Sequence, residues 1–304
     1  MRVAAIDCGT NSIRLLIAEI EGSNFKEISR TMEIVRLGQG VDESGEFHLG
    51  AIARTLSAVD KFTALIESQG VARIRFCATS ASRDARNRDL FLDGVRERMG
   101  ILPEVITGAE EAELSFLGAT RELSSDLGPF LVVDIGGGST EFVFGGQVVE
   151  SAKSVNIGCV RLSERHFHSD PPSAEQIKAA TFDIENAIGE AALIVPIKAA
   201  KTLVAVAGTA TTIAAAGLEL GQYDRHAIHH ARISTQKVLQ ISETFLGLPR
   251  AEREALGYMH PGRVDVIAAG SLILAKIMEA TGAQEFSASE SDILDGMAWS
   301  LAAN

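Results

Sequence analysis

Two stretches of this sequence repeat one pattern, in which an apolar run ends near an aspartate, passes through a glycine-containing turn and enters a second apolar run. The first is AAIDCGTNSIRLLI at residues 4–17, and the second is VVDIGGGSTEF at residues 132–142. Apolar runs on both sides of a tight turn predict two strands joined as a hairpin. We therefore expect two successive regions of the chain to begin with the same strand–turn–strand unit.

The elements expected after each unit support this duplication. After the first unit, the patterns predict a third strand and then alternating helices and strands, with a helix over residues 50–70 whose apolar residues recur at helical spacing. After the second unit they again predict a third strand followed by helices and a strand, ending in a terminal helix. A repeated order of this kind is typical of two α/β domains.

The length of 304 residues also favours two domains, because it exceeds the size at which one hydrophobic core keeps growing. We place them at residues 1–123 and 124–304, with a last helix at roughly 291–304 that can pack back on the first domain. Each is expected to be an α/β domain with a mixed sheet flanked by helices. Since no linker rich in proline or glycine separates them, we expect close packing with a cleft between them.

The two glycine turns are candidate phosphate sites. Glycine tolerates positive φ and lacks a Cβ, so successive N–H groups can point into one concavity that binds anions. Neither turn fits the dinucleotide or P-loop pattern, because each leads into a strand and no GKS or GKT follows. The aspartate before each turn, Asp7 or Asp134, can hold a divalent cation that bridges phosphate oxygens. The predicted phosphate-binding residues are Gly9, Thr10, Asn11, Ser12, Gly136, Gly137, Gly138, Ser139 and Thr140.

A third small-residue turn, VAGTATTIAA at residues 206–215, follows a predicted strand and opens a helix. Backbone donors and the positive end of the helix dipole would there face an anion, which makes Gly208 and Thr209 further phosphate-binding candidates. Close packing of a helix on a strand explains the same small residues. The sequence leaves both interpretations open.

Charge and cysteine content exclude several classes of function. A net charge of −12 disfavours non-specific binding to nucleic acid or to an anionic membrane. The three cysteines show no pairing or metal spacing and are interpreted as reduced core residues. The first residues run directly into a strand without a signal pattern, so we predict a cytoplasmic protein. The histidine pairs at 166/168 and 229/230 have no cysteine or carboxylate at ligand spacing, and we interpret them as surface or loop residues.

Several motifs resemble known families. DCGTNSIRLLI, DIGGGSTEFVFG and VAGTATTIAA are similar to the two phosphate motifs and the later loop of the actin-like ATPase-domain superfamily. The stretches ATSASRDARN, VITGAEEAELSFLGA, SVNIGCVRL and RVDVIAAGSLILAKIM, with the tail SDILDGMA, resemble the exopolyphosphatase/guanosine pentaphosphate phosphohydrolase family in its short, two-domain form. These stretches span nearly the whole chain. The resemblance implies two actin-like (ribonuclease H-like) domains with the active-site cleft between them.

The resemblance also implies an activity and its catalytic residue. It implies hydrolysis of the terminal phosphoanhydride of inorganic polyphosphate with release of orthophosphate, with guanosine pentaphosphate as the alternative substrate. In that family the glutamate directly before the alanine of the GxEEA motif is the catalytic base, which corresponds to Glu111 here. Glu110 is then an ordinary residue of the first helical turn, where a carboxylate stabilises the helix dipole.

The resemblance further implies how phosphate and metal are held. It implies a phosphate-binding arginine at Arg83 and a Mg²⁺ or Mn²⁺ ion at Asp134 and Glu141, with Asp7 as the counterpart in the first domain. It also implies a homodimer. From the residues themselves, a solvated strand end would also explain Glu141.

Two other functions fit the same fold. A kinase of the superfamily usually presents a catalytic aspartate and a sugar-binding set, for which we find no equivalent. A non-enzymatic sensor of guanosine penta- or tetraphosphate would have no need of a water-orienting glutamate such as the one that GAEEA offers.

Overall fold

The computed structural model describes residues 1–303, which form two compact units. Unit 1 comprises Met1–Leu114 together with the C-terminal segment that begins at Ile293, and unit 2 comprises Ser115–Asp292. The division between residues 114 and 115 lies within one helix, α5 (Gly108–Thr120).

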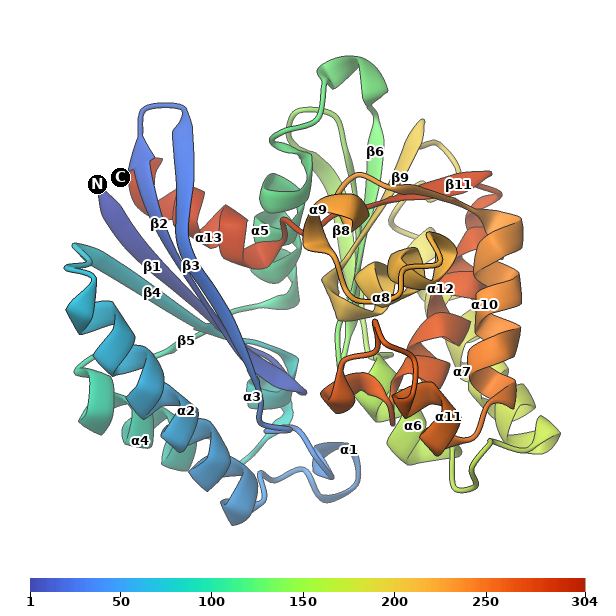
Figure 1. Ribbon diagram of the computed structural model, residues 1–304, viewed down its shortest axis with the longest axis horizontal. Coiled ribbons are helices and arrows are strands. Elements are labelled where there is room, and N and C mark those ends of the chain that lie inside the picture. Colours follow the sequence, from blue (N-terminus) through green and yellow to red (C-terminus); the bar gives the residue numbers. More distant parts are fainter. Residues whose placement is uncertain (304) are drawn as a thin grey trace. The chain divides into compact units, whose positions relative to one another are not determined.

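Unit 1 is built on a five-stranded sheet (Figure 1). Its strands are β1 (Arg2–Cys8), β2 (Ser12–Glu21), β3 (Asn24–Ile34), β4 (Arg73–Ala78) and β5 (Glu104–Val105). Its other helices are α1 (Val41–Ser44), α2 (Leu49–Ser68), α3 (Ser80–Asp84), α4 (Asp89–Met99) and α13 (Ile293–Ala303). The order is β3-β2-β1-β4-β5, and β1 runs antiparallel to β2 but parallel to β4, which is parallel to β5. The sheet is therefore mixed.

Both faces of the central strand β1 are buried, because helices cover the sheet on both sides. Successive side chains of a strand point to opposite faces. Val3 and Ala5 accordingly pack in one cluster with Met297 of α13, whereas Ala4 and Ile6 belong to the core shared with α2 and α4. Figure 1 shows α2 and α4 on one side of the sheet and α13 on the other.

Unit 2 is built on a six-stranded sheet. Its strands are β6 (Phe130–Ile135), β7 (Thr140–Gly145), β8 (Val149–Val155), β9 (Thr202–Val206), β10 (Arg232–Ser234) and β11 (Glu285–Ala288). Its helices are η1 (Ser125–Leu127), α6 (Cys159–His166), α7 (Ala174–Ala192), α8 (Ala207–Gly217), α9 (Arg225–Ile228), α10 (Thr235–Gly247), α11 (Arg250–Glu254), η2 (Pro261–Arg263) and α12 (Ile267–Thr281). The strand order is β10-β11-β9-β6-β7-β8.

The two sheets repeat one topology. Strand β6 is antiparallel to β7 and parallel to β9, which is parallel to β11, so β6, β7, β8, β9 and β11 correspond to β1–β5. Strand β10 adds one antiparallel edge strand to unit 2. The expected duplication and the expected class, two mixed sheets flanked by helices, are confirmed.

Helix α12 lies at the centre of unit 2. It is buried along most of its length and packs against α6, α7, α8 and α10. A helix that is apolar on nearly all sides needs neighbours on all sides. This helix therefore anchors the others, including α6 and α8, which begin beside the glycine turn described below.

The sequence patterns missed some short elements. Strands β10 and β11 have three and four residues, too few to show the alternation on which a strand prediction depends. The small-residue stretch that follows β4 forms the short helix α3.

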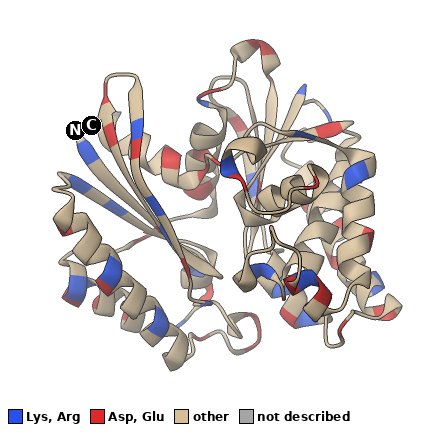
Figure 2. Ribbon diagram, viewed as in Figure 1, with Lys and Arg blue, Asp and Glu red and all other residues tan. Residues whose placement is uncertain are grey.

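Charged residues of both signs are interspersed along the elements of each unit (Figure 2). A polyanion could therefore be bound only where a few cations are gathered locally. Among the helices that the structure describes, none has both the length and the apolar composition needed to cross a bilayer.

The packing of α13 on unit 1 gives a test of the fold. A Cβ at Gly296 would lie 2.0 Å from the carbonyl oxygen of Leu114. Overpacking of this kind lowers the free energy of unfolding by about 1–3 kcal/mol, so Gly296→Ala should lower the urea midpoint and the melting temperature. The control is Gly189→Ala in α7, where a Cβ would meet no described atom within 4 Å. That change should be neutral or stabilise by up to about 1 kcal/mol. Equal stability of the two variants would contradict this account of α13.

Candidate active site

Three parallel strands of unit 1 end at one edge of its sheet. Because β1, β4 and β5 are parallel neighbours, their carboxyl ends lie side by side. The segments that follow these ends are the turn at residues 9–11, helix α3 with Arg83, and the start of α5 with Glu111. The carboxyl edge of such a sheet is where α/β folds bind ligands. Unit 1 thus gathers its predicted site residues at one edge.

The turn of unit 1 is held in a fixed conformation around Thr10. The Gly9 N–H donates to the Ser12 carbonyl over 3.0 Å, and the Gly38 N–H donates to the Thr10 carbonyl over 2.9 Å. A Cβ at Gly38 would lie 2.4 Å from Cγ2 of Thr10. The carbonyl of Asn11 accepts from the N–H groups of residues 35 and 36. Gly38 therefore supports the turn through close contact, a role that the sequence analysis missed.

Gly9 and Gly136 do not use the left-handed conformation that glycine allows. Neither has φ between +20° and +160°. A Cβ at Gly9 would make only ordinary contacts, at 3.7 and 3.8 Å, whereas one at Gly136 would lie 3.1 Å from the Ser139 carbonyl. At Gly136, glycine therefore leaves room for that carbonyl.

Asp7 forms an ion pair within unit 1. Arg14 stands directly opposite it on β2, and Nη2 and Nε of Arg14 lie 2.6 and 3.1 Å from Oδ2 of Asp7. The guanidinium balances the charge of this buried carboxylate, which weighs against Asp7 as a ligand of a divalent cation.

Arg83 and Glu111, predicted separately, lie together. Nη1 of Arg83 donates to Oε2 of Glu111 over 2.7 Å and to the carbonyl of Ile106 over 3.1 Å. Glu111 is 9% exposed. A guanidinium contact of this kind stabilises the ionised carboxylate, which is the form that can accept a proton. Arg83 thus fixes the carboxylate at the start of α5.

The adjacent glutamate has a different environment. Oε1 of Glu110 lies 2.5 Å from Nη2 of Arg75, which also binds Glu104, and the Glu110 side chain is 41% exposed. The two glutamates therefore differ: Glu111 is buried and binds Arg83, whereas Glu110 is more exposed and binds Arg75 of β4.

In unit 2 the triple-glycine turn is hydrogen-bonded to the start of α6. The N–H of Cys159 donates to the carbonyl of Gly136, the N–H groups of Val160 and Arg161 donate to that of Gly137, and Nε of Arg161 donates to that of Gly138 over 2.7 Å. A Cβ at Gly158 would lie 2.4 Å from the carbonyl carbon and oxygen of Gly137. Gly158 and Arg161 stand in the motif SVNIGCVRL, but the sequence analysis assigned them no role.

With these carbonyls engaged, the N–H groups of the turn are available to an anion. Within residues 1–303, the N–H groups of Gly137 and Gly138 donate to no other group. Because β6 and β9 are parallel, with Asp134 opposite Val206, the start of α8 lies at the same edge of the sheet. No side chain caps that helix start, so its first N–H groups are further donors. This cluster of donors is an anion-binding arrangement.

A cation that the sequence analysis missed stands at the start of α8. A Cβ at Gly208 would lie 2.5 Å from Nε and Cζ of Arg263, whose Nη1 donates to Oγ1 of Thr212 over 3.1 Å. Arg263 is the first residue of the stretch RVDVIAAGS, but nothing in the sequence linked it to the helix that starts at Ala207. Thr209 instead turns its side chain toward Cys159 and Gly270, so only its backbone faces the edge.

Asp134 and Glu141 form a buried carboxylate pair. They are directly opposite in the β6–β7 register, which puts both side chains on one face, and they are 7% and 1% exposed. Oδ2 of Asp134 accepts from the Ser115 hydroxyl over 2.6 Å. Oε1 of Glu141 accepts from the hydroxyls of Ser139 (2.8 Å) and Ser154 (2.7 Å). Glu141 is therefore not a solvated strand end.

This pair fits a hard divalent cation, because Mg²⁺ and Mn²⁺ prefer carboxylate oxygens and the two buried carboxylates stand opposite each other on one face of the sheet. The hydroxyls of Ser139 and Thr140 have structural partners, Glu141 and the carbonyl of Ile157. Any contact of residues 139 and 140 with phosphate would thus come from the backbone, or from a hydroxyl that changes its partner.

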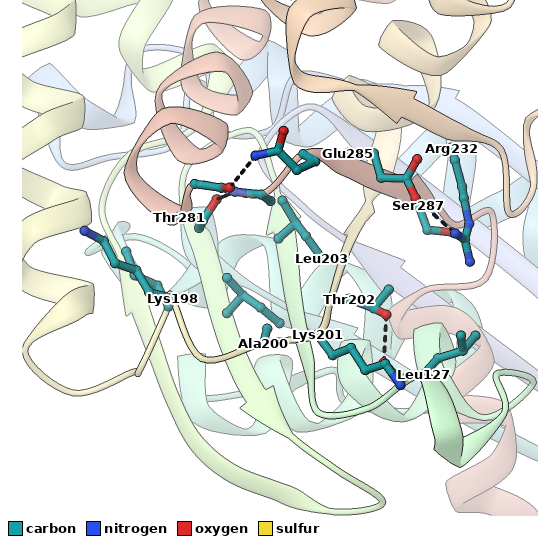
Figure 3. Close-up of a pocket in the computed structure, with 15 residues that line it drawn as sticks. Leu127, Lys198, Ala200, Lys201, Thr202, Leu203, Arg232, Thr281, Glu285 and Ser287 are labelled. Atoms are coloured by element: carbon teal, nitrogen blue, oxygen red, sulfur yellow. Dashed lines mark hydrogen bonds and ion pairs between the residues drawn. The ribbon is translucent and has the colours of Figure 1, made fainter.

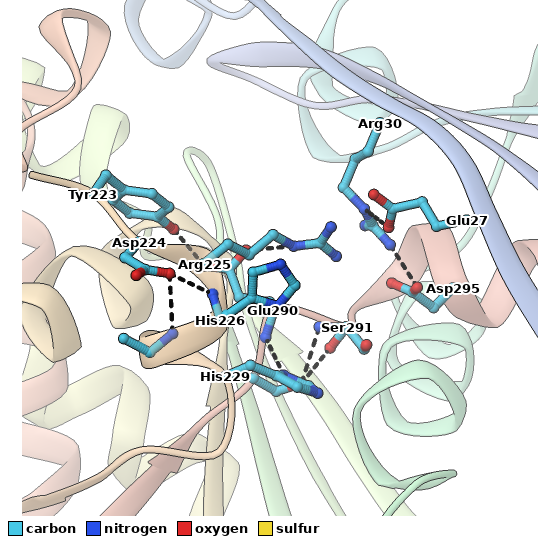
Figure 4. A network of polar contacts seen from close by, with 12 residues as sticks. Glu27, Arg30, Tyr223, Asp224, Arg225, His226, His229, Glu290, Ser291 and Asp295 are labelled. Carbon is cyan, nitrogen blue, oxygen red and sulfur yellow. Dashed lines mark hydrogen bonds and ion pairs between the residues drawn. The ribbon is translucent and has the colours of Figure 1, made fainter.

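The histidine pair at 229/230 lies beside the carboxylate of Glu122, which is too far away in the sequence to have been linked to it by spacing. Glu122, His229 and His230 are the one group of three or more histidine, cysteine or acidic ligands whose ligand atoms meet in the described chain. However, Nδ1 of His229 accepts from the Glu290 N–H over 3.1 Å (Figure 4). The ring proton of neutral His229 therefore lies on Nε2, which is 3.3 Å from Oε2 of Glu122. We interpret the contact as a hydrogen bond rather than a metal site.

A hollow of about 460 Å³ in unit 2 lies elsewhere (Figure 3). One of its lining residues, Thr202, is the first residue of β9. Gly208 lies beyond the other end of that strand, in the first turn of α8. Two of its cations are engaged, Arg232 with Glu285 and Lys201 with the carbonyl of Asp126. The hollow is therefore at the opposite end of β9 from the anion-binding arrangement.

The repeated mixed-sheet topology of the two units defines the class of proteins with duplicated actin-like domains. The chain matches the model of the Ppx/GppA phosphatase family over residues 16–304, and it belongs to that family. It is 46% identical to Exopolyphosphatase 2 of Mycobacterium tuberculosis, with 99% of this chain and 98% of the relative covered. The resemblance and the fold class expected from the motifs are thereby confirmed.

Solved structures give the same result. An exopolyphosphatase-like protein is 40% identical and superposes with a TM-score of 0.95, covering 99% of this chain and 98% of the other. The Ppx/GppA family member of Aquifex aeolicus is 32% identical, with a TM-score of 0.84 and 100% and 98% of the chains covered.

The cysteines beside the two turns give a further test. Cys8 and Cys159 are buried, and burial raises the pKa of both thiols, to about 11 for Cys159. Below such a pKa the thiol stays protonated and unreactive. At about pH 8 the native protein should react slowly with a disulfide reagent, and an alkylating reagent should leave its activity unchanged, whereas all three thiols should react after unfolding. Rapid labelling of the native protein would contradict this placement.

Proposed function

We propose that the protein is an exopolyphosphatase, which hydrolyses the terminal phosphoanhydride of inorganic polyphosphate and releases orthophosphate. The observation that carries this proposal is the buried carboxylate of Glu111, held by Arg83 at the edge of unit 1 where the Thr10 turn also lies. The similarity to Exopolyphosphatase 2 along nearly the whole chain supports the choice of substrate.

The reaction needs a base for water and groups that hold phosphate. Glu111 accepts a proton from water as the water oxygen bonds to the terminal phosphorus. The bridging P–O bond breaks, and its electron pair leaves with the shortened chain. Arg83 orients the Glu111 carboxylate, and it offers its remaining N–H groups to phosphate oxygens.

Unit 2 supplies phosphate binding in this proposal. The N–H groups of Gly137, Gly138 and the first turn of α8 bind non-bridging oxygens, and Arg263 adds a positive charge at the helix start. Asp134 and Glu141 would hold Mg²⁺ or Mn²⁺, which when bound would neutralise charge on the phosphate oxygens. In unit 1, Gly9, Thr10, Asn11 and Ser12 form the corresponding phosphate turn.

Guanosine pentaphosphate is the alternative substrate, because it carries the same kind of terminal phosphoanhydride. Initial rates of orthophosphate release from polyphosphates of several lengths and from guanosine pentaphosphate, measured side by side without an acceptor, decide between them. Release that requires ATP and an acceptor would instead identify a kinase, and tight binding of guanosine penta- or tetraphosphate without turnover would identify a sensor. We also propose that the protein is a homodimer, as the family resemblance implies, and that it is cytoplasmic, as the sequence pattern of its first residues indicates. Light scattering tests the first proposal and cell fractionation the second.

Glu111→Gln tests the base. Glutamine retains the shape and a hydrogen-bond acceptor for Arg83 but cannot take the proton, so turnover should fall by about 10²–10⁴ while polyphosphate binding stays within a few-fold. The matched control is Glu110→Gln, which removes the exposed neighbour and should leave turnover within about threefold. Equal turnover of wild type and Glu111→Gln would remove Glu111 from the mechanism.

Asp134→Asn tests the metal ligand. The amide keeps the hydrogen bond from Ser115 but loses the charge, so the Mg²⁺ concentration for half-maximal activity should rise at least about tenfold, and Mn²⁺ affinity measured by electron paramagnetic resonance should fall equally. The control, Glu150→Gln, changes an exposed carboxylate on β8 and should alter neither quantity. Unchanged Mn²⁺ affinity in Asp134→Asn would exclude the assignment.

A further inference from the structure

The small-residue stretch Thr79–Ser82 contains buried hydroxyls that the mechanism above does not use. Thr79, Ser80 and Ser82 are 3%, 5% and 0% exposed. The stretch follows the carboxyl end of β4 and leads directly to Arg83, which binds Glu111. Buried hydroxyls at a ligand-binding edge need partners, so their hydrogen bonds can be accounted for one by one.

Ser80 makes a single hydrogen bond with Thr10. The Oγ atom of Ser80 and the Oγ1 atom of Thr10 lie 3.0 Å apart, and either can be the donor. Within the part of the chain that the structure describes, neither hydroxyl oxygen has another hydrogen-bond partner. Two hydroxyls carry two protons and one is used in the mutual bond, so one O–H remains without an acceptor in the protein.

The position of this remaining donor is fixed. Gly38 packs against Cγ2 of Thr10, which sets the rotamer of a β-branched side chain and directs its oxygen toward Ser80. Ser80 and Arg83 are three residues apart in α3, a spacing that puts two side chains on neighbouring positions of one helix face. The O–H donor therefore stands at the same edge as the Arg83–Glu111 pair.

We propose that the Thr10–Ser80 hydroxyl pair donates one hydrogen bond to a non-bridging phosphate oxygen of the substrate, which makes Ser80, through this pair, part of the phosphate-binding site. The ligand class is a phosphate oxyanion, because an ionised oxygen is the strongest acceptor for an O–H donor. A neutral donor binds the oxyanion without adding a positive charge that would compete with a metal ion. This inference rests on the proposed function only where it is tested by kcat/KM, because orthophosphate binding can be measured without hydrolysis.

The test compares Ser80→Ala with Ser82→Ala. Ser82 is equally small and buried, but within residues 1–303 its Oγ forms no hydrogen bond, with Thr10 or with any other residue, so it is not part of the hydroxyl pair. Ser80→Ala should lower kcat/KM for polyphosphate about 10- to 100-fold and weaken orthophosphate binding, measured by calorimetry, about tenfold or more. Ser82→Ala should keep both within about twofold. Melting temperatures of both variants show whether the fold is retained.

A double-mutant cycle gives the sharper result. If the two hydroxyls act as one donor, Thr10→Ala and Ser80→Ala together should cost about as much in kcat/KM as either change alone. The proposal is overturned if Ser80→Ala binds orthophosphate as tightly as wild type, if Ser82→Ala shows the same loss, or if the two losses multiply. The measurement of orthophosphate binding does not depend on turnover. If the wild type did not hydrolyse polyphosphate, the proposed function would be contradicted, but the binding of orthophosphate would still test the role of Ser80.

Discussion

The parallel pairing of β1 with β4 and of β6 with β9 is the constraint on which both candidate sites depend. Parallel neighbours end at the same edge, so segments far apart in the sequence must meet there. This pairing brings the turn after Cys8 next to the Thr79–Ser82 stretch in unit 1. In unit 2 it brings the triple-glycine turn next to the start of α8. In each unit the glycine turn joins the two antiparallel strands of a hairpin, β1–β2 in unit 1 and β6–β7 in unit 2.

The two units satisfy their buried carboxylates differently. In unit 1, Asp7 and Glu111 each contact an arginine, so negative charge is balanced within the protein. In unit 2, Asp134 and Glu141 accept hydrogen bonds from serine hydroxyls, which orient the carboxylate oxygens. Burial of like charges side by side is costly unless a cation compensates. The directly opposed Asp134–Glu141 pair is therefore the place where we propose a divalent ion.

Much of the fold and part of the candidate site could be predicted from the sequence because their signals are local. The strand–turn–strand units, the long helices and the aspartate before each turn are consecutive patterns, and the Asp134–Glu141 pairing follows from a seven-residue spacing across a tight turn. Gly38, Gly158 and Arg263 could not be found this way, because each acts on a residue that the chain brings near only after folding. The close approach of the Ser139 carbonyl to Gly136 is likewise visible only in the folded chain.

The central claim is that water, activated by Glu111, attacks the terminal phosphorus of polyphosphate. The most direct test is hydrolysis in water enriched in ¹⁸O, with the released orthophosphate analysed by mass spectrometry. The account predicts one solvent oxygen in each orthophosphate formed, without any added acceptor, and almost no labelled product from Glu111→Gln. Orthophosphate without solvent oxygen, or labelled product formed at the wild-type rate by that variant, would contradict it.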